Sequence, residues 1–316
     1  MFKGVGYLIL TYWLKAETLI RLGWKPRAFF IFMNIDLFGN VIIQDELLRN
    51  KFIEPPFSIL DTKSGSWQKR KKLWINKGLK SEVGRDVSVI NMDTTSKENN
   101  STSYVSVFDP ALCEVLYHWF CKENGNILDP FAGGSVRGII AHYLGYNYTG
   151  IDIRQEQVDS NREQALEILD LNNQPNWYVG DSNIVLDTKF NKEFDLVFSC
   201  PPYADLEVYS NLNGDISNMN YKEFLLAYES IIEKSCIHLK SGGYACFVVG
   251  EVRDKKGNYI GFVPDTINAF KKCGMDFYNE AILLNAIASA SMRANGNMKS
   301  KKLVKVHQNI LVFKKP

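Results

Sequence analysis

A short apolar strand that runs into a glycine-rich turn and then a helix limits the fold of this chain more than any other feature. Residues 126–134 read Asn-Ile-Leu-Asp-Pro-Phe-Ala-Gly-Gly, and apolar residues at helical spacing follow from Ser135 to Gly145. A strand, a tight glycine turn and a helix form the nucleotide-binding crevice of a doubly wound sheet, where ligands bind beyond the carboxyl ends of the strands. The pattern therefore predicts an α/β fold built on a mainly parallel sheet.

Two further strands end in acidic residues that suit a nucleotide. The strand 148–152 ends in Asp152, which is placed to hold ribose hydroxyls. The strand 177–179 is followed by Gly180 and Asp181, and the second of these suits the amino group of an adenine. We therefore expect the crevice to extend across neighbouring strand ends.

An apolar strand that begins at Asp195 runs into a corner of sequence Cys200-Pro201-Pro202-Tyr203. Pro201 has no N–H and restrains Cys200 to an extended conformation, so nearby carbonyl oxygens lack ladder partners and are available as acceptors. Tyr203 offers a flat face on which a base can stack. Acceptors that take the hydrogens of an exocyclic amino group free its delocalised lone pair for reaction. The corner thus indicates amino-group chemistry, although Pro-Pro also occurs as a plain break between elements.

Taken in order, these motifs resemble those of S-adenosylmethionine-dependent DNA amino-methyltransferases, which methylate N6 of adenine or N4 of cytosine. The resemblance spans roughly residues 108–313. Several stretches also resemble the methyltransferases of bacteriophages and mobile elements, namely 55–61, 65–71, 200–210, 247–257 and 307–313. The family usually has Asp, Asn or Ser before Pro-Pro-Tyr, whereas this chain has Cys200, whose thiol is a weaker hydrogen-bond partner. The choice between adenine and cytosine is therefore open.

The resemblance implies a Rossmann-like sheet of seven strands with an N-terminal extension, and S-adenosylmethionine as the cofactor. The implied cofactor contacts are Phe108, Asp109, Asp129, Pro130, Phe131, Ala132, Gly133, Gly134, Asp152, Ile153, Asp181 and Ser182. The implied catalytic residues are Cys200, Pro201, Pro202 and Tyr203. Two of these residues have a second reading: Asp129 would instead brace the glycine turn, and Asp109 with Pro110 would begin a helix as its cap and first turn, a role compatible with the cofactor contact.

The remaining elements are expected to alternate as such a sheet requires. Periodicity predicts helices at 155–170, 222–239 and 264–273, and strands at 244–249, 277–284 and 309–313. The last two strands are expected to form a hairpin at one edge of the sheet. The catalytic domain is expected to cover 104–316.

The first 103 residues are expected to form an N-terminal extension that ends in a polar linker at 93–103. We take Met33 as the natural start, with residues 1–32 as upstream sequence or an extra packed helix. The segment 54–86 combines tryptophans with basic residues, and its candidate contacts to DNA phosphates are Lys69, Arg70 and Lys71. The alternative is an amphipathic helix with Trp67 and Trp74 packed inward and its charges solvated.

Two segments near the catalytic corner are candidates to meet a substrate. The first, 204–221, follows Tyr203 directly. The second, 288–305, is read as a basic loop whose candidate contacts to DNA are Arg293, Lys301 and Lys302; solvated loop charges are the alternative.

Composition limits the partners and the compartment. A net charge of +2 over 316 residues gives no global basic field, so any surface for nucleic acid must be local. The six cysteines show no C-x-x-C spacing and predict reduced thiols of a cytoplasmic protein, with no metal site. Charged residues interrupt every apolar run near the N-terminus, so no membrane span is expected. The expected partner is double-stranded DNA, with or without a restriction endonuclease.

The implied mechanism is direct methyl transfer to a base flipped out of the duplex. Tyr203 would stack on the base, while Cys200 and the adjoining carbonyls would accept its amino hydrogens, with Cys200 shaping the corner rather than acting as a nucleophile. Two alternatives are the same chemistry on an RNA base or a glutamine side chain, and a catalytically silent nucleic-acid-binding subunit. A dinucleotide oxidoreductase is not indicated, because the glycine turn lacks G-x-G-x-x-G spacing.

Overall fold

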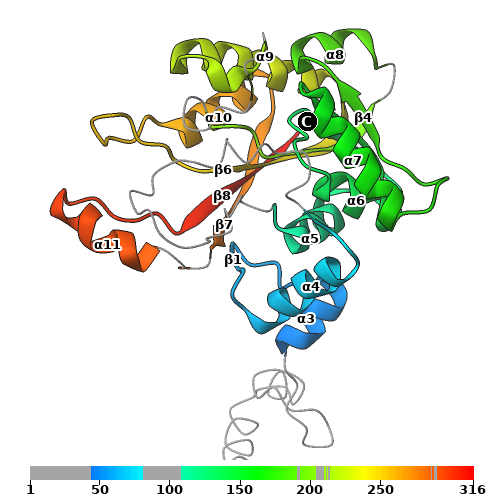
Figure 1. Ribbon diagram of the computed structural model, residues 1–316, viewed down its shortest axis with the longest axis horizontal. Helices are drawn as coiled ribbons and strands as arrows, with labels where there is room; N and C mark the ends of the chain where they lie inside the picture. The colour runs from blue at the N-terminus through cyan, green and yellow to red at the C-terminus, as the bar shows by residue number, and fades with distance from the viewer. Residues whose placement is uncertain are drawn as a thin grey trace, which may run out of the picture. The chain divides into compact units, whose positions relative to one another are not determined.

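The computed structural model describes residues 44–80, 108–190, 193–203, 210, 212, 214–285, 287 and 290–316 (Figure 1). The chain divides into two units, Met1–Pro56 and Phe57–Pro316. Within the first unit the structure describes helix α3 (Gln44–Phe52). All other elements described below belong to the second unit.

The second unit is built on a sheet of eight described strands in the order β1-β7-β8-β6-β5-β2-β3-β4. The strands are β1 (Ile59–Asp61), β2 (Asn126–Asp129), β3 (Asn147–Asp152), β4 (Asn176–Val179), β5 (Phe194–Ser199), β6 (Leu239–Val249), β7 (Asp276–Leu284) and β8 (His307–Lys314). Neighbouring strands are parallel except for β8, which is antiparallel to β6 and β7. Strands β1 to β7 therefore end at one edge, the carboxyl edge, where β8 begins.

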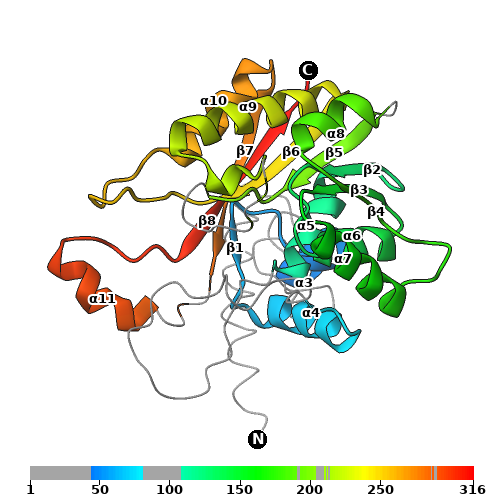
Figure 2. The same cartoon turned by 45° about the horizontal axis from the view of Figure 1, so that its top comes forward.

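Helices cover both faces of the sheet. The described helices of this unit are α4 (Gly65–Asn76), α5 (Pro110–Phe120), α6 (Val136–Tyr143), α7 (Gln155–Ile168), α8 (Ser182–Thr188), α9 (Tyr221–Ile237), α10 (Phe262–Lys272) and α11 (Ala290–Lys299), with a 3-10 turn η3 (Ile216–Asn218). Of these, α5 to α10 cover the sheet. Figures 1 and 2 show α5, α6 and α7 on one face and α8, α9 and α10 on the other. Every residue of β5 is buried, as expected for a central parallel strand covered on both faces.

Aromatic side chains fill much of the core beneath α9 and α10. Phe270 stacks on Phe313 with ring centroids 4.0 Å apart, and Phe247 meets Phe270 edge to face at 4.8 Å. Phe224 and Tyr228 of α9 also stack, at 5.4 Å. Each such ring removes a large apolar area from water, so this core fixes the helices against the sheet that carries the site.

The structure confirms the α/β fold but corrects two expectations: the number of strands, and which strand lies outermost on the β7 side of the sheet. The eighth strand, β1, comes from the segment assigned to the N-terminal extension, and it pairs with β7 through Ile59 opposite Ile282. The expected hairpin of β7 and β8 forms, yet it is not the edge, because β1 lies outside β7. A strand of three residues is too short to show an alternating pattern, which explains why sequence periodicity did not reveal β1.

Helix α4 confirms the amphipathic reading of the basic, tryptophan-bearing segment. Trp67 and Trp74 are buried, and the Ser64 hydroxyl caps the helix by accepting from the Trp67 N–H. Helix α11, in contrast, occupies a segment expected to be a loop. The start at Met33, the linker 93–103 and most of the segment just after Tyr203 lie outside the described residues. Within the described part of the chain, no helix has the length and apolarity needed to cross a membrane.

Candidate active site

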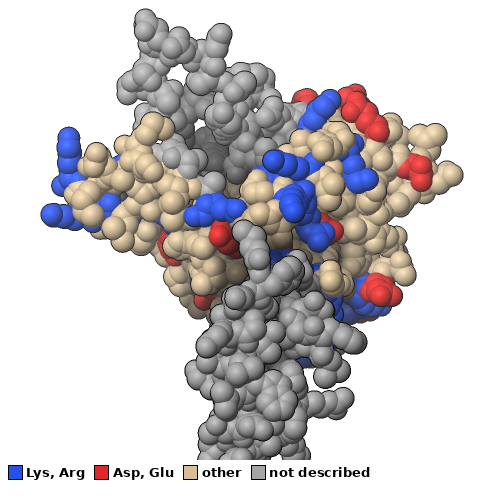
Figure 3. Space-filling model, turned by 90° about the horizontal axis from the view of Figure 1, so that it is seen from below, with Lys and Arg blue, Asp and Glu red and all other residues tan. Residues whose placement is uncertain are grey.

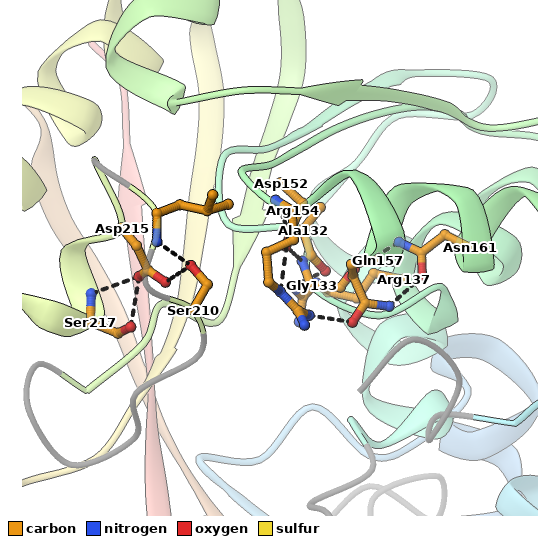
Figure 4. Close-up of polar contacts among 11 residues, drawn as sticks. Ala132, Gly133, Arg137, Asp152, Arg154, Gln157, Asn161, Ser210, Asp215 and Ser217 are labelled. Carbon is orange, nitrogen blue, oxygen red and sulfur yellow. Dashed lines mark hydrogen bonds and ion pairs between the residues drawn. The ribbon is translucent and has the colours of Figure 1, made fainter. Parts of the chain in front are cut away.

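The glycine turn after β2 is fixed by side chains from two other elements (Figure 4). The Gly133 N–H donates to Asp152 Oδ2 at 3.0 Å, and the Gly133 carbonyl accepts from Asn161 Nδ2 at 2.7 Å. Asn161 is itself held by Gln157, at 3.0 Å, and Gln157 accepts from the Arg154 guanidinium at 2.5 Å. The buried face of α7 thus carries polar residues that fix the Gly133 carbonyl, while Asp152 at the end of β3 fixes the Gly133 N–H.

The same turn is open on its other side. Gly133 has a φ of +51°, which a residue with a side chain adopts only with strain, and a Cβ built there would meet no atom within 4 Å. A ligand can therefore approach the backbone of the turn directly.

Asp129 lies beneath the turn in a fully buried network, which supports its bracing role over direct contact with a ligand. Its Oδ2 accepts from Arg137 Nε at 2.5 Å and from the Tyr148 hydroxyl at 2.7 Å, and its Oδ1 accepts from the Ser199 hydroxyl at 2.5 Å. Arg137 also donates to the carbonyls of Phe131 and Ala132, at 2.6 and 2.8 Å. The network joins β2, β3, β5 and α6 under the turn.

Charge and burial act together in this network. Burial alone would lower the pKa of Arg137, but the neighbouring Asp129 carboxylate raises it above its ordinary value, so the guanidinium stays charged. Burial and the Asp129 charge both raise the pKa of Tyr148, so its hydroxyl stays protonated and donates a hydrogen bond to the carboxylate. Sequence reasoning did not find Arg137, because a single arginine on an apolar helix has no local signature of its partner.

The ends of β3 and β4 meet a third segment, the one that precedes η3. A Cβ built on Gly214 would lie 3.0 Å from Asp181 Oδ2 and 3.5 Å from Ile153 Cδ1. This segment is held by Asp215, whose carboxylate accepts from the hydroxyls of Ser210 and Ser217, each at 2.6 Å (Figure 4). The structure thus brings the predicted residues Ile153 and Asp181 together beneath a segment that sequence reasoning had not linked to them.

Several other residues predicted to contact the cofactor form contacts that stabilise the fold. Ser182 donates its hydroxyl to the Pro130 carbonyl at 2.6 Å and so ties α8 to the glycine turn. Asp109 caps α5 by accepting from the Ala111 N–H at 3.0 Å, which confirms the helix-start reading. The Phe108 ring lies under the Arg137 guanidinium, 4.6 Å from ring centroid to Cζ.

The Pro-Pro-Tyr corner follows β5, and the ring of Tyr203 is oriented from two sides. Gln308, the second residue of β8, donates from Nε2 to the Tyr203 hydroxyl at 2.9 Å. The ring meets Phe262 of α10 edge to face, with centroids 5.8 Å apart and an interplanar angle of 83°. Cys200 is partly buried and Pro201 buried at the entry to the corner. Sequence reasoning placed the corner and missed Gln308, which lies 105 residues further along the chain.

The candidate DNA-contacting residues differ in whether their charges are paired with an acidic side chain and in how exposed they are. On α4, Arg70 pairs with Glu114 at 2.6 Å and Lys71 with Asp109 at 3.4 Å, so both lean onto α5, while Lys69 is exposed. In the second candidate segment, Arg293 and Lys301 are exposed. Lys302 is half-buried, with its side chain packed over Gly257. Figure 3 shows Lys and Arg side chains spread across one face, with acidic side chains sparser.

These residues fit S-adenosylmethionine, the expected cofactor. The open backbone at Gly133 admits a ligand closely, the Asp152 carboxylate keeps part of its surface accessible at the end of β3, and Ile153 and Asp181 offer an apolar face and an acceptor for a purine. The cofactor supplies a methyl group activated by a sulfonium leaving group.

Replacing Asp152 with Asn is expected to weaken S-adenosylmethionine binding by about tenfold or more, because hydrogen bonds to a charged group contribute about 1.5–3 kcal/mol. Burial raises the pKa of Asp152 above its ordinary value, although the N–H groups of Arg154 and Gly133 act against this. Affinity is therefore expected to fall as the pH drops through that raised pKa. Calorimetric titration with the cofactor tests both, with Asp159→Asn, on the exposed face of α7, as the control. Equal affinity in wild type and Asp152→Asn would contradict the ribose role.

Residues 44–163 match the family model described as DNA methylase, of the N6 and N4 amino-methylase class. No curated protein matches the chain.

Solved structures of low sequence identity resemble parts of the chain. TrmN from Thermus thermophilus is 15% identical with a TM-score of 0.44, over 66% of this chain and 49% of TrmN, so the chain spans about half the length of TrmN. A TehB-like SAM-dependent methyltransferase from Corynebacterium glutamicum is 18% identical, with a TM-score of 0.38 over 62% and 83% of the two chains. Magnesium protoporphyrin IX methyltransferase (ChlM) from Synechocystis, solved with bound SAM, is 12% identical, with a TM-score of 0.41 over 66% and 79%. The match at residues 44–163 thus relates this part of the chain to the DNA methylase family and supports a methyltransferase that uses S-adenosylmethionine.

Proposed function

We propose that this enzyme methylates the exocyclic amino group of adenine (N6) or cytosine (N4) in double-stranded DNA, with the target base flipped out of the duplex. The observation that carries the proposal is the fixed ring of Tyr203 at the end of β5, held by Gln308 and Phe262. An oriented aromatic face at a strand end suits a planar base that has left its stack.

The strand order supports a position of this ring near the glycine turn at Gly133. Strand β2, which leads into the glycine turn, pairs directly with β5, which leads into the corner. Paired strands lie about 4.8 Å apart, so a base stacked on Tyr203 would present its amino group toward the turn at Gly133. Direct transfer needs this alignment and no covalent enzyme intermediate.

The corner supplies acceptors for the amino hydrogens. Pro201 carries no N–H, and the carbonyl oxygens around Cys200 and Pro201 lie past the last paired residue of β5, Ser199. Acceptors there would draw the amino nitrogen toward tetrahedral geometry and free its lone pair to attack. The family match to DNA methylases supports DNA as the acceptor.

Replacing Cys200 with Ser is expected to preserve turnover within a few fold. The thiol of Cys200 is proposed to shape the corner, and a serine hydroxyl is a stronger hydrogen-bond partner of similar size. Single-turnover methylation of duplex DNA measures the effect. Complete loss of turnover in Cys200→Ser, together with a trapped covalent DNA adduct in wild type, would show that the thiol is a nucleophile and overturn this role.

The direct test of the proposed function is nucleoside mass spectrometry of unmethylated DNA incubated with the protein and labelled S-adenosylmethionine. Labelled N6-methyladenine or N4-methylcytosine would establish the acceptor and name the base in one measurement. Unmodified DNA in the presence of cofactor binding would point to an RNA or protein acceptor, or to a silent subunit, and would refute DNA methylation.

A further inference from the structure

Helix α11 stands clear of the sheet and the other helices, at the carboxyl edge where the candidate site lies (Figures 1 and 2). It belongs to the connection between β7 and β8, of which the structure describes residues 285, 287 and 290–306; these described residues are called the arm. The arm is closed at its root by a hydrogen bond from the Asn285 N–H to the Val306 carbonyl at 3.0 Å. Two residues beyond this root, Gln308 contacts Tyr203. The arm therefore rises from the same strand that orients the proposed catalytic ring.

Packing against the rest of the protein contributes little to the stability of α11. Ala290 is its single buried residue, and Met292 and Met298 are 80% and 51% exposed. Isolated helices of this length are marginal in water, and most helices in proteins are stabilised by a packed apolar face. A ten-residue helix presented in this way is suited to gain its packing from a partner.

The charge of the arm identifies the kind of partner. Glu280 is the last acidic residue of the chain, and the residues after it carry seven basic side chains: Arg293, Lys299, Lys301, Lys302, Lys305, Lys314 and Lys315. Five of these seven, Arg293, Lys299, Lys301, Lys302 and Lys305, lie within the arm, which contains no acidic residue. The arm is therefore locally basic and complements a polyanion.

The side chains of α11 suit the major groove of duplex DNA, which admits an α-helix. The helix is slender, with Ala, Ser and Gly among its residues, and it presents Arg293 and Asn295 to solvent. Arginine pairs with guanine and asparagine with adenine through two hydrogen bonds each at the major-groove edge. Exposed Lys299 and Lys301 follow at the end of the helix, where they can meet phosphates. Lys302, packed over Gly257, anchors the arm to the neighbouring turn.

We propose that α11 enters the major groove beside the flipped base and sets the DNA sequence that the enzyme recognises. Arg293 and Asn295 read base edges, and Lys299 and Lys301 hold the backbone. This inference rests on the proposed function, since a recognition helix needs a DNA substrate.

The test compares three variants: Arg293→Ala/Asn295→Ala, Lys301→Ala, and the control Lys271→Ala, which changes an exposed lysine on α10. Sequencing of methylated genomic DNA gives the recognition sequence, and anisotropy of labelled duplexes gives affinity at several salt concentrations. The double variant is expected to lose about 5- to 150-fold of its discrimination at the positions it reads. Lys301→Ala is expected to weaken binding equally for all sequences and to reduce the salt slope by about one. Lys271→Ala is expected to match wild type.

An unchanged recognition sequence in the Arg293→Ala/Asn295→Ala variant would overturn the inference while leaving DNA methylation intact. If wild type methylates no DNA, the proposed function fails, and duplex binding alone then decides the role of α11. If wild type does not bind duplex DNA, or if wild type and both arm variants bind it equally, α11 is not a DNA-binding helix and the inference is overturned. Because the substituted side chains are exposed, thermal unfolding of all variants is expected to match wild type, which separates these outcomes from misfolding.

Discussion

The Tyr203→Ala variant is expected to lose methyl transfer by about two orders of magnitude while it binds S-adenosylmethionine normally. Stacking of a base on an aromatic side chain contributes about 1–3 kcal/mol, which corresponds to about 5- to 150-fold. The ring is held at the end of β5 by contacts to α10 and β8, so its loss leaves a flipped base without its platform. Single-turnover rates on duplex DNA measure the loss, and cofactor titration verifies that the nucleotide crevice is intact.

Tyr203→Phe separates the ring from its hydroxyl. This variant keeps the stacking face and loses the acceptor for the Gln308 amide, so a reduction of only a few fold is expected. Gln308→Leu removes the same hydrogen bond from the other side, and the double variant should therefore be no worse than either single one. If Tyr203→Phe is as damaging as Tyr203→Ala, the hydroxyl rather than the stacking face carries the activity, and the proposed role of the ring is wrong.

The elements that sequence reasoning located are those whose signals are local. The strand and glycine turn at 126–134 contain their own apolar run and their own turn residues, so the structure reproduces them closely in β2 and the start of α6. The helices expected at 155–170 and 264–273 appear as α7 and α10 with small shifts at their ends. The fold class follows from such segments, because their alternation along the chain already specifies a parallel sheet.

The parts that sequence reasoning missed depend on partners far away in the chain. Gln157 and Asn161 look like ordinary solvated residues of a polar helix, yet both are fully buried against the glycine turn. Gln308 is a polar residue at the start of an apolar strand, and its partner Tyr203 lies on another element. A hydrogen bond between distant elements leaves no periodic pattern, so only the folded chain shows which polar residues serve the site.

Asp129 shows how burial decides between two roles that the sequence left open. A carboxylate at the end of a strand suits either a ligand or a brace for the turn. In the structure it has no exposed surface, and Arg137, Tyr148 and Ser199 all donate to it. The acid that keeps part of its surface accessible is Asp152, one strand away, and this is where the contact to a ribose is expected.

Replacing Arg137 with Met is expected to lower the free energy of unfolding by about 3–5 kcal/mol, because it leaves the Asp129 carboxylate charged and buried without its cation. The Phe131 and Ala132 carbonyls lose their donor in the same step, so the glycine turn is expected to loosen and cofactor affinity to fall as well. Chemical denaturation monitored by circular dichroism measures the stability change. Lys272→Met is the control, since the Lys272 ion pair with Glu229 is largely exposed and such pairs contribute less than about 1 kcal/mol.

The combined variant Asp129→Asn/Arg137→Met tests the reason for this loss. With the carboxylate neutralised, the second substitution no longer strands a buried charge, so the double variant is expected to lose less than the sum of the two single ones. Simple additivity would mean that Arg137 and Asp129 act independently, and a loss in Arg137→Met no larger than in Lys272→Met would mean that the pair does not hold the turn. Either result would mean that the glycine turn is held mainly by Asp152 and by Asn161 of α7, the other contacts that fix Gly133, rather than by this ion pair.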